Sequence, residues 1–327
     1  MHEVLVIGGG PAGLTAGMFC RMRKMDVLVV DAGRIGGQLV SLYADKPVHD
    51  WPGHAQVIAG TLAASLRDHA RELGVAMLEH SKVMALAPRA EGGFSVSVQH
   101  VVSGETQVLE TQAVIIAIGG GAFEPRRLKL AGEETLGEDQ LTYRMVDTAR
   151  CAGRRVVVVG GGDSGLESAV AAHRAGAEVA LVQVLDHFTG MEANIEQVES
   201  LGLARHLNTR VRELLVRNGR LTGVVVQTKG AEAPVTLPCD HLVVNIGAAV
   251  NLEAVKGWGI AVEGNLIPVD HHMTTNLEGV FACGDIVTHE GKYKLLLTAS
   301  SEGAVAANSA YVHVRRPARV TMGDLYT

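Results

Sequence analysis

The chain is poor in several features that would assign it to large classes of protein. Its four cysteines form no Cys-x-x-Cys pair, and its histidines have no metal-type spacing with them; the cysteines are Cys20, Cys151, Cys239 and Cys283. We therefore expect neither a dithiol centre of that type nor a metal site.

The sequence also lacks long apolar runs and an excess of positive charge. No stretch reaches the ~18 apolar residues of a membrane span, and no secretory leader pattern opens the chain. The formal net charge of -6 argues against a nucleic-acid partner. We therefore expect a cytoplasmic protein with neither a nucleic-acid nor a membrane partner. A hydrophobic content of 47% in 327 residues is enough apolar material for two cores.

Glycine is abundant, and two glycine loops share one pattern. Gly8 to Gly13 follows the apolar run 4–7, and Gly160 to Gly165 follows the run 156–159. Both read G-x-G-x-x-G between an expected strand and an expected helix. The first glycine permits a tight turn, the second lets backbone approach a pyrophosphate, and the third lets helix pack on strand. The helix N-terminus then binds phosphate, so two such loops indicate two dinucleotide sites or descent from them.

The residue after the second strand of each copy is the next signal. The first copy predicts a strand over 3–7, a helix over 12–24 and a strand over 26–31. Asp31 is the last residue of the second strand. It lies 23 residues after Gly8 (31 − 8), at the position where a dinucleotide fold has its ribose-binding carboxylate.

In the second copy we expect a strand over 156–159, a helix over 164–175 and a strand over 178–182. The same offset reaches Gln183 (160 + 23), and no lysine or arginine follows before Arg205. A 2′-phosphate therefore has no obvious cationic partner there.

Each copy closes with an apolar strand that runs into glycine, at 113–119 and at 241–247. Segments 81–109 and 209–238 alternate apolar and polar residues around turns, which predicts a β-meander in each copy. The pattern is that of an α/β protein with two Rossmann-like three-layer domains, one inserted into the other.

A further motif, Phe281 to Asp285, ends an expected strand in Gly-Asp before a helix of small residues over 298–310. An aspartate there can accept a hydrogen bond from a ribityl hydroxyl, and the helix N-terminus can stabilise a reduced flavin.

Together these motifs resemble the thioredoxin-reductase-like flavoproteins. The resemblance is carried by the first glycine loop, Asp31 and the segments 36–39, 50–53 and 281–285. Segments 37–43, 120–126, 143–147 and 290–295 are similar, more narrowly, to the bacterial ferredoxin/flavodoxin–NADP reductases of the thioredoxin-reductase type.

The resemblance implies an FAD-binding domain of residues 1–119 and 248–327, an inserted NAD(P)-binding-type domain of residues 120–247, and a homodimer. The flavin carries the chemistry, so no catalytic acid or base is expected. The FAD contacts that carry over are Gly8, Gly10, Pro11, Ala12 and Gly13 at the pyrophosphate, Asp31 at the adenosine ribose, Val83 near the adenine, Gly37, Gln38 and Asp50 at the flavin, Tyr43 stacked on it, Gly119 and Phe123 at the hinge, and Gly284 and Asp285 at the ribityl chain. Tyr326 either covers the second flavin face or belongs to an exposed tail. The second nucleotide site comprises Gly160, Gly162, Asp163, Ser164, Gly165 and Gln183.

The chain departs from the family in two places. The Cys-x-x-Cys positions of thioredoxin reductases fall on Tyr143 and Val146, so direct dithiol exchange is not expected. Where the ferredoxin reductases have basic residues after the second strand of the inserted domain, this chain has Gln183, Val184, Leu185 and, further on, Thr189. This leaves open whether NADPH, NADH or neither binds.

The leading hypothesis is an FAD-dependent oxidoreductase that passes electrons between a nicotinamide nucleotide and a ferredoxin- or flavodoxin-like carrier. One alternative is an FAD protein that no longer uses NADPH and is reduced by NADH, ferredoxin or another donor. Another is a non-catalytic, flavin-bound interaction protein.

Overall fold

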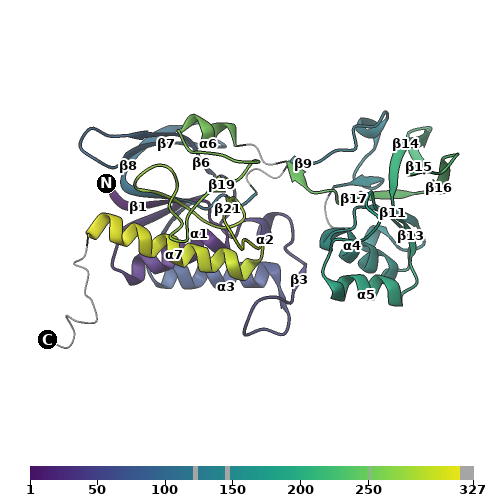
Figure 1. The fold of residues 1–327 in the computed structure, drawn as a ribbon, viewed down its shortest axis with the longest axis horizontal. Coiled ribbons are helices and arrows are strands. Elements are labelled where there is room, and N and C mark those ends of the chain that lie inside the picture. The colour runs from purple at the N-terminus through teal and green to yellow at the C-terminus, as the bar shows by residue number, and fades with distance from the viewer. Residues whose placement is uncertain (121–123, 144–147, 250–251, 317–327) are drawn as a thin grey trace. The chain divides into compact units, whose positions relative to one another are not determined.

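The structure is a computed structural model that describes residues 1–120, 124–143, 148–249 and 252–316 (Figure 1). It divides into two compact units. The first comprises Met1–Ala122 and Val250–Thr327, and the second comprises Phe123–Ala249.

The first unit is built on a parallel sheet in which β5, β2, β1 and β8 are neighbours and β20 pairs with β8. Strands β1 (His2–Ile7) and β2 (Val27–Val30) are joined by helix α1 (Pro11–Met22), which makes the expected βαβ unit. Both strands are apolar along most of their length because the sheet is covered on both faces.

Strand β8 (Thr106–Ile116) belongs to two sheet regions at once. Its second half lies between β1 and β20 in the parallel sheet, and its first half pairs antiparallel with β7 (Phe94–His100). The expected closing strand and the last strand of the first meander are therefore one continuous strand. Its residues change from mostly exposed to fully buried along its length, because only the second half enters the core.

Two layers cover the parallel sheet of this unit. Helices α1, α3 (Ala59–Glu72) and α7 (Leu296–Arg315) pack on one face, and the meander with α6 (Glu253–Gly257) packs on the other (Figure 1). The remaining elements of the unit are α2 (Gln38–Ser41), β3 (Pro47–Val48), β4 (Val57–Ile58), β5 (Ala76–Leu78), β6 (Ser81–Pro88), β19 (Ile267–Pro268), β20 (Val280–Ala282) and β21 (Val287–Thr288).

The second unit repeats the plan on a smaller scale. Its sheet has the order β10-β17-β11-β12-β13, and all the pairings are parallel. Helices α4 and α5 cover one face, and a separate meander of β14, β15 and β16 packs on the other. The elements are β9 (Glu124–Pro125), η1 (Glu133–Thr135), β10 (Leu141–Thr142), η2 (Thr148–Arg150), β11 (Arg155–Val159), α4 (Asp163–Arg174), β12 (Glu178–Val182), α5 (Glu192–Ser200), β13 (Ala204–His206), β14 (Thr209–Arg217), β15 (Arg220–Thr228), β16 (Val235–Pro238), β17 (His241–Val244) and β18 (Ala248–Ala249).

The expected α/β fold with Rossmann-like sheets and one meander per copy is confirmed. Within the described ranges, no helix combines the length and the apolar character that crossing a bilayer requires.

Burial of His241 predicts a pH dependence for the stability of the second unit. His241 is the first residue of β17, and it is 1% exposed. Its Nδ1 atom lies 2.9 Å from the Asp139 carbonyl oxygen. Burial lowers the pKa of His241 from 6.5. The unfolded chain therefore takes up the proton first, so stability is complete above about pH 6.5 and falls as the pH drops towards the folded-state pKa.

We expect calorimetry between about pH 8 and about pH 5.5 to show this loss, and His241→Gln to reduce it. Burial also lowers the pKa of His206, so His206→Gln should reduce the loss in the same direction. An unfolding temperature of the His241→Gln variant with the same pH dependence as the wild type would contradict the assignment.

Candidate functional site

Several of the predicted flavin-site residues of the first unit gather where parallel strands end. The glycine loop follows β1, Asp31 follows β2, and Gly284 with Asp285 follows β20. The carboxyl edge of an open parallel sheet is where ligands bind in such folds.

The glycine loop is a close crossing of helix over strand. A Cβ on Gly13 would lie 1.8 Å from the Gly8 carbonyl oxygen, and a Cβ on Gly8 would lie 2.3 Å from the Ala117 carbonyl oxygen. Gly8 also has a φ of +109°, a conformation that side chains disfavour. Pro11 and Ala12 begin α1, whose N-cap has no side-chain hydrogen bond.

Gly10 differs from these two glycines because open space lies above it. Apart from its chain neighbours, the nearest heavy atom to a Cβ there would be the Gly37 Cα, at 4.0 Å. The glycine is therefore not required by the protein's own packing. Its small size fits a loop that a pyrophosphate approaches closely.

Asp31 closes the loop from the neighbouring strand. Its carboxylate accepts hydrogen bonds from the Gly9 N–H at 2.6 Å and from the Gly33 N–H at 2.7 Å. One acceptor position remains on each oxygen, since a carboxylate oxygen has two lone pairs. The geometry therefore fits a carboxylate that also receives ribose hydroxyls.

Gly37, Gln38 and Tyr43 lie on one short segment beside the loop. A Cβ on Gly37 would lie 2.9 Å from the Gly10 Cα, and Gln38 begins α2. The Tyr43 N–H donates to the Gln38 carbonyl at 3.1 Å. The Tyr43 ring is half-buried and packs against a hydrophobic cluster that includes Leu39 and Leu62.

Three further predicted residues of the first unit lie at other points of the fold. Asp50 is exposed in the loop between β3 and β4. The Val83 side chain is 5% exposed and packs in the core of the unit. Gly119 has a φ of +57° just after β8. Phe123 and Tyr326 lie outside the described residues.

A buried charged cluster beside Gly284 was not predicted. Glu302 on α7 accepts from the Gly284 N–H at 2.8 Å and from the Lys292 ammonium at 2.7 Å on each oxygen. His289 Nε2 lies 3.1 Å from the same carboxylate. The Lys292 and Glu302 side chains are 8% and 9% exposed. A lone glutamate among the small residues of this helix was the available sequence signal.

The cluster also sets the electrostatics of Asp285. Burial raises the pKa of the Asp285 carboxyl group, and the charges of Lys292 and Lys294 oppose that rise. On the same helix, the Ser300 hydroxyl is buried with no hydrogen-bond partner among the described residues. This edge of the sheet thus offers polar groups to a ligand.

The second glycine loop repeats the crossing. A Cβ on Gly165 would lie 2.1 Å from the Gly160 carbonyl oxygen. A Cβ on Gly160 would lie 2.1 Å from the Asn245 carbonyl oxygen. Gly162, like Gly10, faces open space, because a Cβ there would have the Thr189 hydroxyl as its nearest neighbour at 3.8 Å. The Asn245 Oδ1 atom is buried beside the loop with no partner in the described structure.

The helix that follows this loop begins at Asp163 and Ser164. The Asp163 carboxylate accepts from the Met191 N–H at 2.8 Å and from the Asn194 side chain at 2.7 Å. Asp163 therefore ties α4 to the start of α5, and Ser164 lies half-buried in the first turn of α4.

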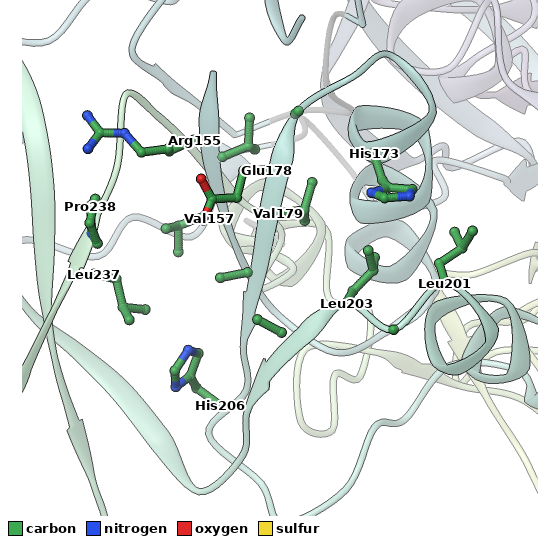
Figure 2. A pocket seen from close by; sticks show the side chains of 15 residues that line it. Arg155, Val157, His173, Glu178, Val179, Leu201, Leu203, His206, Leu237 and Pro238 are labelled. Carbon is green, nitrogen blue, oxygen red and sulfur yellow. The ribbon is translucent and has the colours of Figure 1, made fainter. Parts of the chain in front are cut away.

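A hollow of about 420 Å³ in the second unit is distinct from this loop (Figure 2). Its lining includes the first residues of three strands, Arg155, Glu178 and Ala204, with Leu237 and Pro238 of β16 across from them. The glycine loop follows the opposite end of β11, so we assign no nucleotide to the hollow.

Comparison with known proteins gives consistent results. The family described as pyridine nucleotide-disulphide oxidoreductase matches residues 2–303. A ferredoxin–NADP reductase of Enterococcus faecalis is 34% identical over 98% of this chain and 94% of that protein. Ferredoxin–NADP reductase 2 of Shouchella clausii is 32% identical over 99% of this chain and 96% of that protein. Thioredoxin reductase of Lactococcus lactis, a solved structure, is 25% identical with a TM-score of 0.85, covering 97% of this chain and 100% of that one.

Gly10→Ala and Gly13→Ala are expected to act in different ways. The Gly10 methyl group would occupy ligand space, so the fold should persist while FAD affinity falls by about 1–3 kcal/mol. The Gly13 methyl group would overlap backbone and should destabilise the first unit itself. Thermal unfolding without added FAD and titration with FAD separate the two effects. Equal losses of stability in both variants would contradict the distinction.

Lys292→Met is expected to lower the free energy of unfolding by about 3–5 kcal/mol, because it leaves the Glu302 carboxylate buried without its cation. The double variant Lys292→Met/Glu302→Gln should recover part of this loss, since the glutamine amide oxygen still accepts from the Gly284 N–H. Chemical unfolding of all the variants, including Glu302→Gln alone, measures the coupling. Strictly additive effects of the two substitutions would rule out a coupled pair.

Proposed function

The chain belongs to the pyridine nucleotide-disulphide oxidoreductase family and is an FAD-dependent oxidoreductase. From that premise, we propose that it passes electrons between a nicotinamide nucleotide and a one-electron carrier of the ferredoxin or flavodoxin kind. The observation that carries the proposal is the first glycine loop, whose open Gly10 faces the same sheet edge as Asp31 and Asp285.

In this proposal the first unit holds FAD along the edge of its parallel sheet. The α1 N-terminus and Gly10 receive the pyrophosphate, because free N–H groups and the helix dipole favour negative charge. Asp31 accepts from the adenosine ribose, and Asp285 accepts from the ribityl chain. The Glu302 carboxylate fixes the Gly284 amide and thereby the turn that carries Asp285.

FAD, when bound, supplies the redox chemistry by accepting a hydride from a nicotinamide and releasing electrons singly. The chain's residues position the reacting groups. Tyr43 offers a half-buried ring for stacking, and its backbone N–H donates to the Gln38 carbonyl. The second unit presents the nicotinamide nucleotide on Gly160, Gly162 and Gly165.

The thiols of the chain favour an external electron acceptor over an internal dithiol. All four cysteines are buried, and no disulfide joins any two of them. Burial raises the pKa of the Cys20 and Cys239 thiols to about 12, which leaves almost no thiolate at neutral pH. At the first of the two positions where thioredoxin reductases have cysteine, the Tyr143 hydroxyl donates to the buried Glu133 carboxylate. Val146, at the second position, lies outside the described residues.

The names of the relatives support the same pair of electron-transfer partners. Two relatives, at 34% and 32% identity, are named ferredoxin–NADP reductases, and this chain covers almost the whole length of each. A small iron–sulfur or flavin protein therefore fits as the partner.

The test is anaerobic stopped-flow reduction of the purified, FAD-loaded protein by NADH and by NADPH in turn. Bleaching of the oxidised flavin band by either nucleotide, followed by reoxidation when ferredoxin is added, is the expected result. Tyr43→Ala should change the flavin absorption spectrum and its rate of reduction while leaving the glycine loop intact. Tyr311→Ala, on the distant helix face where Arg23 lies 4.9 Å from the ring, is the matched control.

Two outcomes would reject the proposal. If neither nucleotide bleaches the flavin but reduced ferredoxin does, the second unit has another role. If no donor reduces the flavin and no acceptor reoxidises it after chemical reduction, the protein is a non-catalytic flavin-binding protein.

A further inference from the structure

We propose that the second unit selects a dinucleotide whose adenosine ribose bears a free 2′-hydroxyl, as in NADH, against one that bears a 2′-phosphate. The selection is made by Gln183, Val184, Leu185 and Asp186 at the end of β12. This inference rests on the proposed function and names its nucleotide.

The two glycine loops of the chain identify the ribose position by comparison with each other. In the first unit, a Cβ on Gly9 would lie 3.3 Å from the Asp31 side chain. In the second unit, a Cβ on Gly161 would lie 2.8 Å from the Gln183 amide. Each side chain stands at the end of the second strand of a βαβ unit, where the ribose hydroxyls of a dinucleotide bind. Gln183 therefore occupies the place that Asp31 occupies in the first unit.

The Gln183 side chain is uncharged, and its amide group already forms hydrogen bonds with the residues that follow it. Its side chain is 6% exposed, and its amide oxygen accepts from the Val184 N–H at 3.0 Å. Its amide nitrogen donates to the His187 carbonyl at 3.3 Å. The amide can share these bonds with a ribose hydroxyl, but it cannot neutralise a phosphate dianion.

The next two residues present hydrocarbon where a 2′-phosphate would lie. Val184 and Leu185 are 45% and 42% exposed. Both follow Gln183 directly and leave the sheet with it. A desolvated phosphate next to exposed aliphatic side chains loses hydration and gains no hydrogen bonds, whereas the less polar adenosine tolerates such a surface.

The charge nearest to this segment in sequence is negative. Asp186 is exposed, and its Oδ1 atom lies 2.6 Å from His187 Nδ1. That hydrogen bond lowers the pKa of the Asp186 carboxyl group, so it is ionised at neutral pH. A carboxylate at this point repels a 2′-phosphate.

Two basic residues near the segment have acidic neighbours. No lysine or arginine occurs from Gln183 to Ala204. The Arg205 guanidinium lies 2.6 Å from the Glu199 carboxylate. Lys229 lies close enough for its charge to act on Asp186, so the acid offsets part of its attraction for phosphate. Each missing charge-assisted hydrogen bond lowers affinity by about tenfold or more.

The experiment compares NADH with NADPH in single-turnover reduction of the FAD-loaded protein. We expect the second-order rate constant for NADH to exceed that for NADPH by at least about tenfold. Calorimetric titration with NAD⁺ and with NADP⁺ gives the same comparison without electron transfer. As isolated probes, ADP should inhibit reduction more strongly than 2′,5′-ADP.

Val184→Arg/Leu185→Arg is expected to reverse the preference by supplying two cations at exposed positions that do not enter the core. Its NADPH affinity should weaken with added salt, as a contact between charges does. Val184→Gln/Leu185→Gln is the matched control, because it adds long polar side chains without charge and should keep the preference for NADH. Asp186→Asn should raise NADPH affinity alone. FAD absorbance and thermal unfolding verify that each variant folds.

Equal or better use of NADPH by the wild type would overturn the inference while leaving the proposed function intact. Absence of binding by both NAD⁺ and NADP⁺ would overturn the inference and the nucleotide part of the proposed function together. Binding of NAD⁺ alone, without flavin reduction by NADH, would support the inference and reject the proposed electron transfer.

Discussion

The close crossing of a helix over a strand is the constraint on which the rest of this structure depends. At Gly13 the backbone of α1 comes so near Gly8 that a single methyl group would overlap a carbonyl oxygen. The same closeness continues outward, because a Cβ on Gly303 of α7 would lie 2.2 Å from the Ala12 carbonyl oxygen. Since Glu302 precedes Gly303, this packing also brings its carboxylate to the Gly284 amide.

The chain contains the crossing twice, yet its two copies differ in what surrounds it. In the first unit, a charged anchor at Asp31 and the Lys292–Glu302 pair form a polar edge held by short hydrogen bonds. In the second, a neutral Gln183 takes the position of Asp31, followed by two exposed aliphatic residues. In our proposal, the backbone geometry of each loop accepts a dinucleotide, and the side chains at the strand end decide which one.

Local signals in the sequence predicted the parts that local physics controls. Strands, helices and both glycine loops were predictable because apolar runs and glycine spacing act over a few residues. The sharing of β8 between two sheet regions was not, since it depends on which half of the strand meets the core. The Glu302 cluster was not predictable either, because its partners Gly284 and Lys292 lie 18 and 10 residues away and meet only after folding.

Separation of fold from specificity follows from where each group of residues lies. The glycines at the crossings are enclosed by backbone, so changing them disturbs the unit that contains them. Val184 and Leu185 are exposed and contribute little to the core, so substitutions there should leave the strand in place. If these residues select the nucleotide as we propose, nucleotide preference can change in this architecture without any change in the fold, because they carry little of its stability.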